Sequence, residues 1–214
     1  MVSVEKNDFV EIEFVGKIKD TGEVFDTNSK EEIAKRRLNL AAKPYVLCVG
    51  KSMSIKGLDE NLIGKEIGKD YSADFTPEDA FGKRNPSLMR MVPLKVFMEQ
   101  KIVPQKGMQL SIDGSLARVI SVSSGRVLLD FNNPLAGRVV SYTYKIIRKI
   151  EDDREKVNSM QDFFFKQRFD FEIKDKEVFF KVEEQLKKFI ELMGKPLEDI
   201  LGMKIRAEVI EKKK

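Results

Sequence analysis

The chain has 214 residues, 42% of them hydrophobic and 35% charged, with 39 Lys or Arg against 35 Asp or Glu, which is enough for one to three globular domains. It has no histidine, which excludes Ser-His and Cys-His catalysis and most zinc sites, and we expect neither a metal nor a cofactor. One cysteine, no apolar run of roughly 20 residues and no basic-apolar leader predict a cytoplasmic protein that does not enter a membrane.

The N-terminal part predicts an antiparallel sheet curved around one short helix. Val10, Ile12 and Phe14 alternate with charged residues, which is typical of a half-buried strand over 8–16. Residues 57–64 predict the short helix, with apolar residues at helical spacing and a glycine at its end. Further strands are predicted over 24–27, 45–50 and 71–76, and a surface helix over 29–40 with Ser29 as its cap.

An inserted segment interrupts this sheet. The chain leaves the sheet near 78–82 and returns near 130–137. The 47 residues of 84–130 carry their own turns and a predicted hairpin over 116–122 and 127–131, which indicates a small β-rich domain. The insertion holds seven basic and three acidic residues, so it accounts for the whole net charge of +4.

The C-terminal part contributes the last strand of the N-terminal sheet and adds a third domain. An alternating strand is predicted over 138–150, residues 151–155 read as a charged linker, and 158–167 predict a helix. A ββαβ module follows, with strands over 169–173, 178–182 and 203–209 and a helix over 185–193 that ends before Gly194. The predicted fold class is α+β, with domains formed by 1–83 plus 131–150, by 84–130 and by 156–214.

Four segments in this order, 22–27, 54–60, 80–82 and 130–137, resemble FKBP-type peptidyl-prolyl isomerases. The place of the insertion resembles the SlyD-like branch with its insert-in-flap domain. The tail is similar to the extra C-terminal domain of the archaeal long-type members. The resemblance implies an FKBP-like sheet around a short helix and an enzyme that isomerises X-Pro bonds.

The resemblance also implies an apolar pocket for the substrate proline over the short helix. Asp26 would be the one carboxylate at its edge, and the backbone N–H of Ile55 would donate a hydrogen bond to the substrate. The walls and floor of the pocket would be Phe14, Phe25, Tyr45, Leu47, Ile55, Leu58, Phe81, Leu135 and Tyr142. From spacing alone, most of these residues would be ordinary core, and Asp26 would anchor the turn after its strand.

The sequence departs from the family pattern at three positions. Phe81 stands where many relatives have a tyrosine, Leu58 where many have a tryptophan, and Asn133 where SlyD-like members often have a histidine. The pocket therefore lacks the tyrosine hydroxyl that would bind the substrate carbonyl. The histidine-rich tail of some bacterial relatives is also missing, so nickel binding is not expected.

The expected partners are unfolded or nascent polypeptides that contain X-Pro bonds. Methionine beside basic residues makes an adaptable apolar surface, which we expect on the insertion at Met89, Met91, Val92, Phe97 and Met98. The alternative is a holdase chaperone or a ribosome- or RNA-associated module with little catalysis, although nucleic acid is not the expected partner. The aromatic-rich tail predicts a homodimer through the C-terminal domain, with docking onto the host domain as the alternative.

Overall fold

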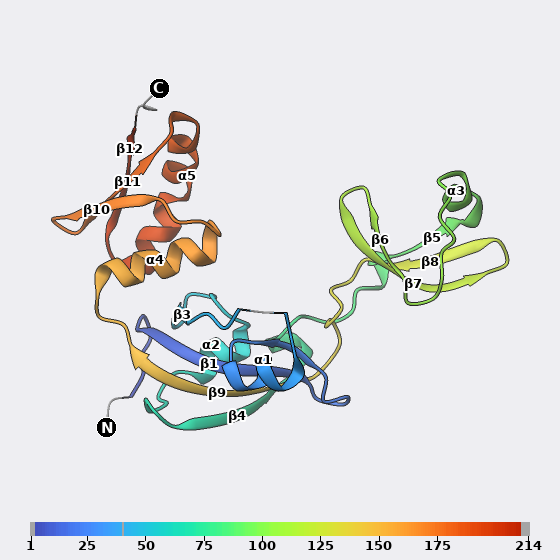
Figure 1. Cartoon of the computed structure of the whole chain (residues 1–214), viewed down its shortest axis with the longest axis horizontal. Helices are drawn as coiled ribbons and strands as arrows, with labels where there is room; N and C mark the ends of the chain where they lie inside the picture. Colours follow the sequence, from blue (N-terminus) through green and yellow to red (C-terminus); the bar gives the residue numbers. More distant parts are fainter. Residues whose placement is uncertain (1–2, 40, 211–214) are drawn as a thin grey trace. The chain divides into compact units, whose positions relative to one another are not determined.

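The computed structural model of the chain describes residues 3–39 and 41–210 (Figure 1). It divides into two compact units: unit 1 contains Met1–Phe75 and Ser141–Lys214, and unit 2 contains Thr76–Val140. Both combine helices with antiparallel sheets or, in the C-terminal part of unit 1, a mixed sheet, so the fold class is α+β, as predicted. Leu40, the last residue of the predicted surface helix, lies outside the described residues.

The larger sheet of unit 1 is built on β1 (Phe9–Ile18), which pairs with three other strands. Its first half pairs with β3 (Tyr45–Cys48), and its second half pairs with β2 (Val24–Thr27). The strand order is β2-β1-β9-β4, where β9 is Val140–Lys149 and β4 is Asp70–Phe75. The apolar residues of β1 that alternate in sequence are buried, which confirms the predicted strand.

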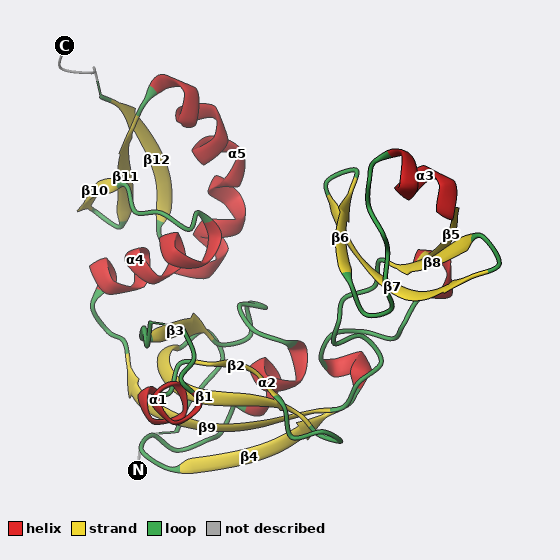
Figure 2. Cartoon of the chain, turned by 45° about the vertical axis from the view of Figure 1, so that its right-hand side comes forward, coloured by secondary structure: helices red, strands yellow, loops and turns green. Residues whose placement is uncertain are grey.

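Helix α2 (Lys56–Asn61) lies against this sheet (Figure 2). Leu58 is buried, and a Cβ added to Gly57 would lie 2.4 Å from Cδ1 of Phe75, so the helix backbone directly contacts the end of β4. The Tyr144 hydroxyl donates a hydrogen bond of 2.6 Å to Oδ1 of Asn61, which attaches the last residue of the helix to β9. The short helix predicted from the sequence is therefore confirmed as the element that the sheet wraps.

Helix α1 (Lys30–Arg36) is the predicted surface helix in a shorter form. Ser29 occupies the N-cap position, but its side chain makes no capping hydrogen bond, so that detail of the prediction was wrong. Its N–H instead donates a hydrogen bond of 3.0 Å to the hydroxyl of Thr27. None of the helical residues is buried, which fits the predicted position on the surface.

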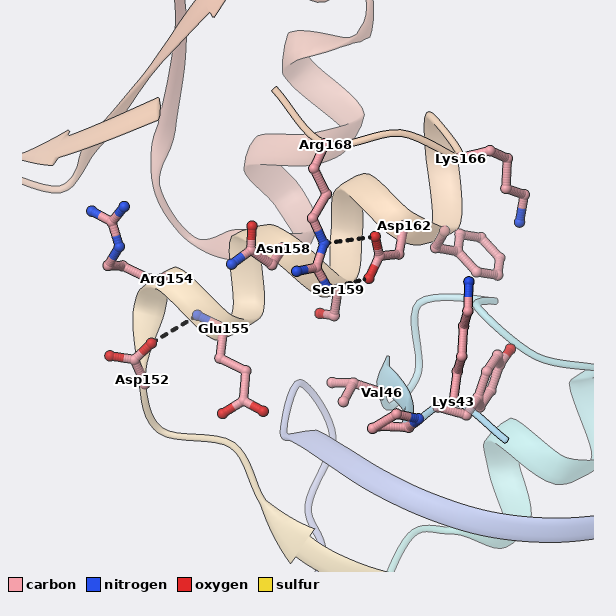
Figure 3. A pocket seen from close by; sticks show the side chains of 13 residues that line it. Lys43, Val46, Asp152, Arg154, Glu155, Asn158, Ser159, Asp162, Lys166 and Arg168 are labelled. Carbon is pink, nitrogen blue, oxygen red and sulfur yellow. Dashed lines mark hydrogen bonds and ion pairs between the residues drawn. The ribbon is translucent and has the colours of Figure 1, made fainter. Parts of the chain in front are cut away.

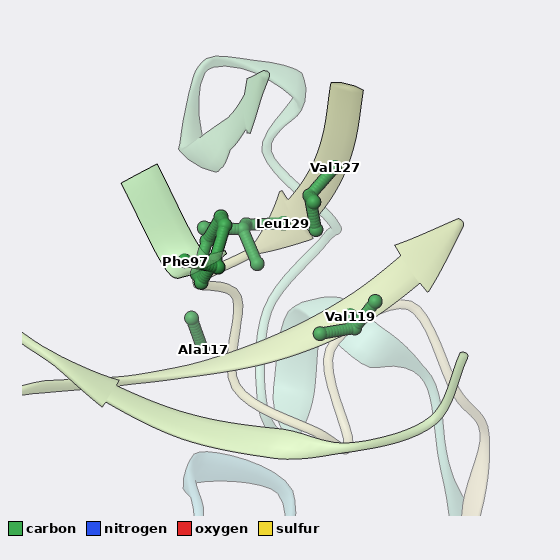
Figure 4. Packing of buried hydrophobic residues seen from close by; sticks show 5 residues of the cluster. All are labelled: Phe97, Ala117, Val119, Val127 and Leu129. Atoms are coloured by element: carbon green, nitrogen blue, oxygen red, sulfur yellow. The ribbon is translucent and has the colours of Figure 1, made fainter. Parts of the chain in front are cut away.

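Unit 2 is a four-stranded antiparallel sheet with one helix. Its strand order is β5-β8-β7-β6, and the predicted hairpin is confirmed as β7 (Ser115–Ser123) and β8 (Arg126–Asp130). The other elements are β5 (Met89–Pro93), α3 (Leu94–Glu99), β6 (Gln109–Ile112) and the 3-10 turns Pro77–Asp79 and Pro86–Leu88. Figure 4 shows its core, which α3, β7 and β8 fill with Phe97, Ala117, Val119, Val127 and Leu129.

The C-terminal segment of unit 1 begins with α4 (Asp153–Phe164) and continues as the predicted ββαβ module. Strands β10 (Asp170–Lys174) and β11 (Glu177–Val182) are antiparallel, and β12 (Lys204–Val209) returns parallel to β11 after α5 (Glu184–Leu201). The predicted linker was wrong, because Asp152 caps α4: its Oδ1 accepts a hydrogen bond of 2.8 Å from the N–H of Glu155. The predicted end of α5 was also wrong, since Gly194 is buried within the helix.

The C-terminal segment is attached to the larger sheet within unit 1. Nε of Arg148, in β9, lies 2.8 Å from a carboxylate oxygen of Glu11 in β1, and the other end of the guanidinium pairs with Glu155 in α4. The thiol of Cys48 in β3 lies 3.8 Å from the carbonyl of Ile200 in α5. Across residues 3–39 and 41–210, no helix is long and apolar enough to cross a membrane.

Candidate active site

Four aromatic rings from four different strands meet on the helix side of the larger sheet. The ring of Phe14 in β1 is 5.5 Å from the ring of Tyr45 in β3 and 5.8 Å from that of Tyr142 in β9, measured between centroids. The ring of Phe25 in β2 meets Tyr142 edge-on, also at 5.8 Å. Alternation along each strand directs these side chains to one face, so segments distant in sequence build one aromatic cluster.

Only part of this cluster is accessible to solvent. Phe14 and Tyr142 are buried, whereas Phe25 and Tyr45 are half-buried and form its accessible rim. Leu47 and Leu58, which the sequence placed in the pocket lining, are fully buried. These two leucines are part of the core and do not line an open surface.

Ile55 stands at the N-cap of α2 with an extended backbone. Its carbonyl accepts a hydrogen bond from the N–H of Asp59, while no described residue accepts one from its own N–H. The side chain is half-buried. A free N–H at the start of a helix is an effective hydrogen-bond donor to a ligand carbonyl.

Asp26 follows Phe25 in β2 and stands beside two phenols. The surface of the residue is exposed, but protein atoms crowd its carboxyl group, and this desolvation raises its pKa above 3.8 against the opposing hydrogen bond from the N–H of Thr27. Burial, and then the negative charge of Asp26, raise the pKa of Tyr45 to about 12 and that of Tyr142 above its usual range. Both phenols therefore stay neutral, and one carboxylate lies at the edge of the aromatic cluster.

Two residues that support the site were not found from the sequence. A Cβ on Gly16 would lie 2.8 Å from Cζ of Phe25 and 3.2 Å from Cζ of Tyr142, so this position in β1 must be glycine for the two rings to pack as they do. The buried carboxylate of Asp59 accepts hydrogen bonds of 2.8 Å from the N–H of Gly50 and 2.9 Å from that of Ser52. It holds the loop between β3 and α2, where Tyr45 also donates a hydrogen bond to the carbonyl of Met53.

The remaining predicted site residues belong to unit 2. Phe81 and Leu135 are half-buried there. Of the residues predicted to bind unfolded polypeptide, Met91 is 58% exposed and Met98 is 53% exposed. Met89 and Val92 are half-buried.

Phe97 corrects the prediction for this set. It is only 4% exposed and packs between α3 and the sheet, because an amphipathic helix on a small sheet must direct its largest side chain into the core. It supports the surface of unit 2 and is not part of it.

The site suits a reaction that needs no nucleophile. Rotation about a peptide bond has a barrier of about 18–20 kcal/mol, because the twisted amide loses its resonance. A twisted amide has less charge separation than a planar one, so an apolar aromatic surface favours it over the planar form. Among residues 3–39 and 41–210, no three His, Cys, Asp or Glu side chains come together as metal ligands would.

Comparison with known proteins gives the chain a family. The profile of the FKBP-type peptidyl-prolyl cis-trans isomerases matches residues 2–102, and a profile described as FKBP26, IF domain, matches residues 90–135. The short-type peptidyl-prolyl cis-trans isomerase of Methanocaldococcus jannaschii is 30% identical over 146 residues, which cover 67% of this chain and 92% of that protein. The FKBP-type 16 kDa peptidyl-prolyl cis-trans isomerase of Escherichia coli K12 is 26% identical over 150 residues, covering 68% and 93%.

Two further comparisons are weaker. The SlyD isomerase of Helicobacter pylori is 26% identical over 126 residues, which cover 56% of this chain and 66% of that protein. A solved structure of the three FKBP domains of wheat FKBP73 covers 71% of this chain and 42% of its own, with a TM-score of 0.39 and 15% identity, which is too low to add to the assignment. The sequence relatives establish the family: this chain belongs to the FKBP-type peptidyl-prolyl cis-trans isomerases.

Proposed function

We propose that the aromatic cluster binds the proline ring of an X-Pro substrate and that the amide twists there. The rim formed by Phe25 and Tyr45 receives the ring, and Asp26 tunes the field beside the twisting carbonyl. The N–H of Ile55 donates to the carbonyl after the proline. The hydrogen bond of a tyrosine hydroxyl is not available, because residue 81 is phenylalanine. The observation that carries the proposal is the convergence of four rings and one carboxylate from four strands.

The second part of the proposal concerns unit 2, which gathers unfolded polypeptide for the isomerase site. Met91, Met98, Leu116 and Val103 are all more than half exposed, which is unusual for so small a sheet. Met91 also lies beside a cation, with its sulfur 3.7 Å from Nη1 of Arg126. Such a surface accepts varied apolar segments, because methionine side chains adapt their shape.

Removing the insertion tests this division of labour. The segments by which the chain enters and leaves the sheet of unit 2 are held together. The N–H of Gly137 donates to the carbonyl of Gly82 at 2.8 Å, and the N–H of Asn85 donates to Oδ1 of Asn132 at 2.8 Å. A short loop can therefore replace residues 84–130 without straining the larger sheet of unit 1, since the entropic cost of closing a loop depends only weakly on its length. We expect the shortened chain to isomerise a tetrapeptide nearly as well as the full chain.

The same variant should lose most of its catalysis of a proline-limited protein refolding reaction. The reason is that a second binding site on the same chain raises the local concentration of X-Pro bonds at the pocket. Met91→Ser with Met98→Ser is the matched variant that keeps the insertion folded, since both side chains are exposed. Equal losses on peptide and protein would contradict the proposal and show that the insertion builds the pocket.

A holdase with little catalysis is the second candidate, because the exposed apolar side chains of unit 2 favour binding of unfolded chains whether or not turnover follows. A protease-free isomerisation assay on a short proline peptide separates the two. Binding that weakens steeply with salt would instead indicate RNA, because phosphate contacts release counterions.

We further propose a cytoplasmic homodimer that associates through residues 156–214, which would correspond to the extra domain of long-type members. The single cysteine, Cys48, is a free thiol, which fits a reducing compartment. On α5, Leu192 is 79% exposed and Phe189 is 45% exposed, which supports an interface there.

A further inference from the structure

A cleft opens beside the aromatic cluster, between the chain at β3 and helix α4 (Figure 3). Its volume is about 520 Å³, which is within the range of ligand pockets. Pro44, Tyr45 and Val46 form one wall, and the first three turns of α4 form the other. Tyr45 belongs to both places: it lines the cleft, and its ring packs on Phe14 of the candidate active site. The cleft and the aromatic cluster therefore share one side chain, so a polypeptide bound at the cluster lies next to the cleft.

The charges of the cleft do not cancel. Arg168 is neutralised by Asp162, with nitrogen to oxygen distances of 2.9 and 2.7 Å, and Glu155 is neutralised by Arg148. Lys43, Arg154 and Lys166 also line the cleft, and none of them forms an ion pair with any residue that the structure describes. One carboxylate remains, that of Asp152, and it is used to cap α4.

The two lysines are placed on opposite walls. Figure 3 shows Lys43 extending from the β3 side toward α4, and Lys166 lies just after the last turn of that helix. The Nζ of Lys166 is 5.3 Å from the centre of the Phe163 ring, which also lines the cleft. Both lysines are exposed, so their ammonium groups are accessible to a segment bound in the cleft.

The walls are fixed relative to each other. Arg148 joins the first turn of α4 to Glu11 in β1, the strand that also carries Phe14. At the far end of the helix, the fully buried side chain of Gln161 accepts a hydrogen bond of 2.7 Å from the N–H of Phe169, which anchors the loop that carries Lys166. These contacts fix α4 and the loop that carries Lys166 relative to the larger sheet.

We propose that this cleft is a substrate subsite of the isomerase, which binds an acidic segment of the same polypeptide that places its X-Pro bond on the aromatic cluster. Lys43 and Lys166 are specificity residues of the subsite. The inference rests on the proposed use of the aromatic cluster for proline. It makes the C-terminal segment part of substrate selection: clients with Asp or Glu near an X-Pro bond are preferred, and clients with Lys or Arg there are disfavoured.

The test compares peptides that differ only outside the proline core. A tetrapeptide with one Leu-Pro bond is extended with Glu-Gly-Glu-Gly or with Lys-Gly-Lys-Gly. Each extension is attached at the N-terminus in one peptide and at the C-terminus in another. Isomerisation by the full chain is followed by NMR exchange. We expect the acidic extension at one end to raise kcat/KM over the tetrapeptide by roughly two- to tenfold at low salt, through a lower KM, because each exposed ion pair contributes modestly. About 1 M salt should remove the gain, because it screens exposed charges.

The substitution Lys43→Gln with Lys166→Gln should abolish this gain and leave tetrapeptide turnover unchanged. The control is Lys188→Gln with Lys195→Gln, which removes the same charge from exposed positions of α5 and should keep the gain. Equal rates for acidic and basic extensions, or the same loss in the control, would overturn the inference. Failure of all variants to act on the tetrapeptide would instead refute the proposed use of the aromatic cluster.

Discussion

At the scale of single residues, Asp26 has opposite expected effects on stability and on activity. Its pKa is raised in the folded protein, so the folded state binds a proton more readily than the unfolded state does. In the pH window between 3.8 and the raised value, the free energy of unfolding contributed by this group therefore falls as the pH rises. A carboxylate whose folded environment disfavours its charged form is a candidate for a functional role.

We predict that Asp26→Asn lowers kcat/KM for a short X-Pro peptide by roughly tenfold, which corresponds to about 1.4 kcal/mol of activation free energy. The midpoint of thermal unfolding at pH 7 should stay unchanged or rise. The asparagine can still accept the hydrogen bond from the N–H of Thr27, so the turn keeps its anchor. Glu23→Gln, an exposed change in the same hairpin, controls for net charge. Unchanged turnover with lost stability would show that Asp26 only anchors the turn.

Gly16 gives a second prediction at this scale. In Gly16→Ala the new Cβ would lie 2.8 Å from the ring of Phe25, so the ring must move away from Tyr142. We expect a loss of stability of roughly 1–3 kcal/mol from overpacking and a fall in turnover, measured by urea unfolding and by the peptide assay. Because the chain has no tryptophan, the fluorescence of its four tyrosines, Tyr142 among them, can be followed during unfolding. A variant with full activity would mean that Phe25 does not bind substrate.

At the scale of elements, the sequence predicted most strands because each has one buried and one exposed face. It failed where two structures share one local pattern. Acidic residues before a helix look like a charged linker, and only the hydrogen bond from Glu155 N–H to Asp152 distinguishes a cap from a spacer. Likewise, a glycine such as Gly194 is typical of a helix end, but α5 continues to Leu201 because its C-terminal half packs against β12.

The interior position of Gly194 leads to a prediction. A Cβ there would meet Cβ of Ile205 at 3.9 Å, an ordinary contact, and the backbone is helical. We expect Gly194→Ala to raise the free energy of unfolding by about 0.5–1 kcal/mol, because alanine loses less backbone entropy in a helix. It is also the matched glycine control for Gly16→Ala. Destabilisation would mean that α5 ends near Gly194, as the sequence alone indicated.

At the scale of the whole molecule, the candidate site could be named from the family resemblance but not from local pattern. Its rings come from four strands spread over more than a hundred residues, and its supports depend on contacts that no periodicity reveals, such as Asp59 holding the loop at Gly50. Phe97 shows the same limit in unit 2, because an apolar residue on a short helix has equal sequence signals for core and surface.

The last prediction concerns self-association of the C-terminal segment. The sequence suggested more aromatic surface than this segment can hide, yet Phe171, Phe180 and Ile190 are buried within it. Four large apolar residues of the segment remain exposed: Val209 and Ile210 at the end of β12, and Phe189 and Leu192 on α5. The last two are three residues apart and therefore lie on one face of the helix. A twofold dimer would place this face against its own copy, which is the arrangement that most homo-oligomers use.

We predict that the full chain sediments at tens of micromolar with twice its mass of 24.6 kDa, and that Leu192→Glu returns it to the monomer. Leu192 is 79% exposed, so the substitution leaves the folded monomer intact, whereas a charge in an apolar twofold interface meets its own like charge. The exposed Lys106→Glu, in unit 2, serves as the control outside the C-terminal segment. A monomer in every case would refute the dimer and leave attachment to the larger sheet, through Arg148, as the better account of the tail's apolar surface.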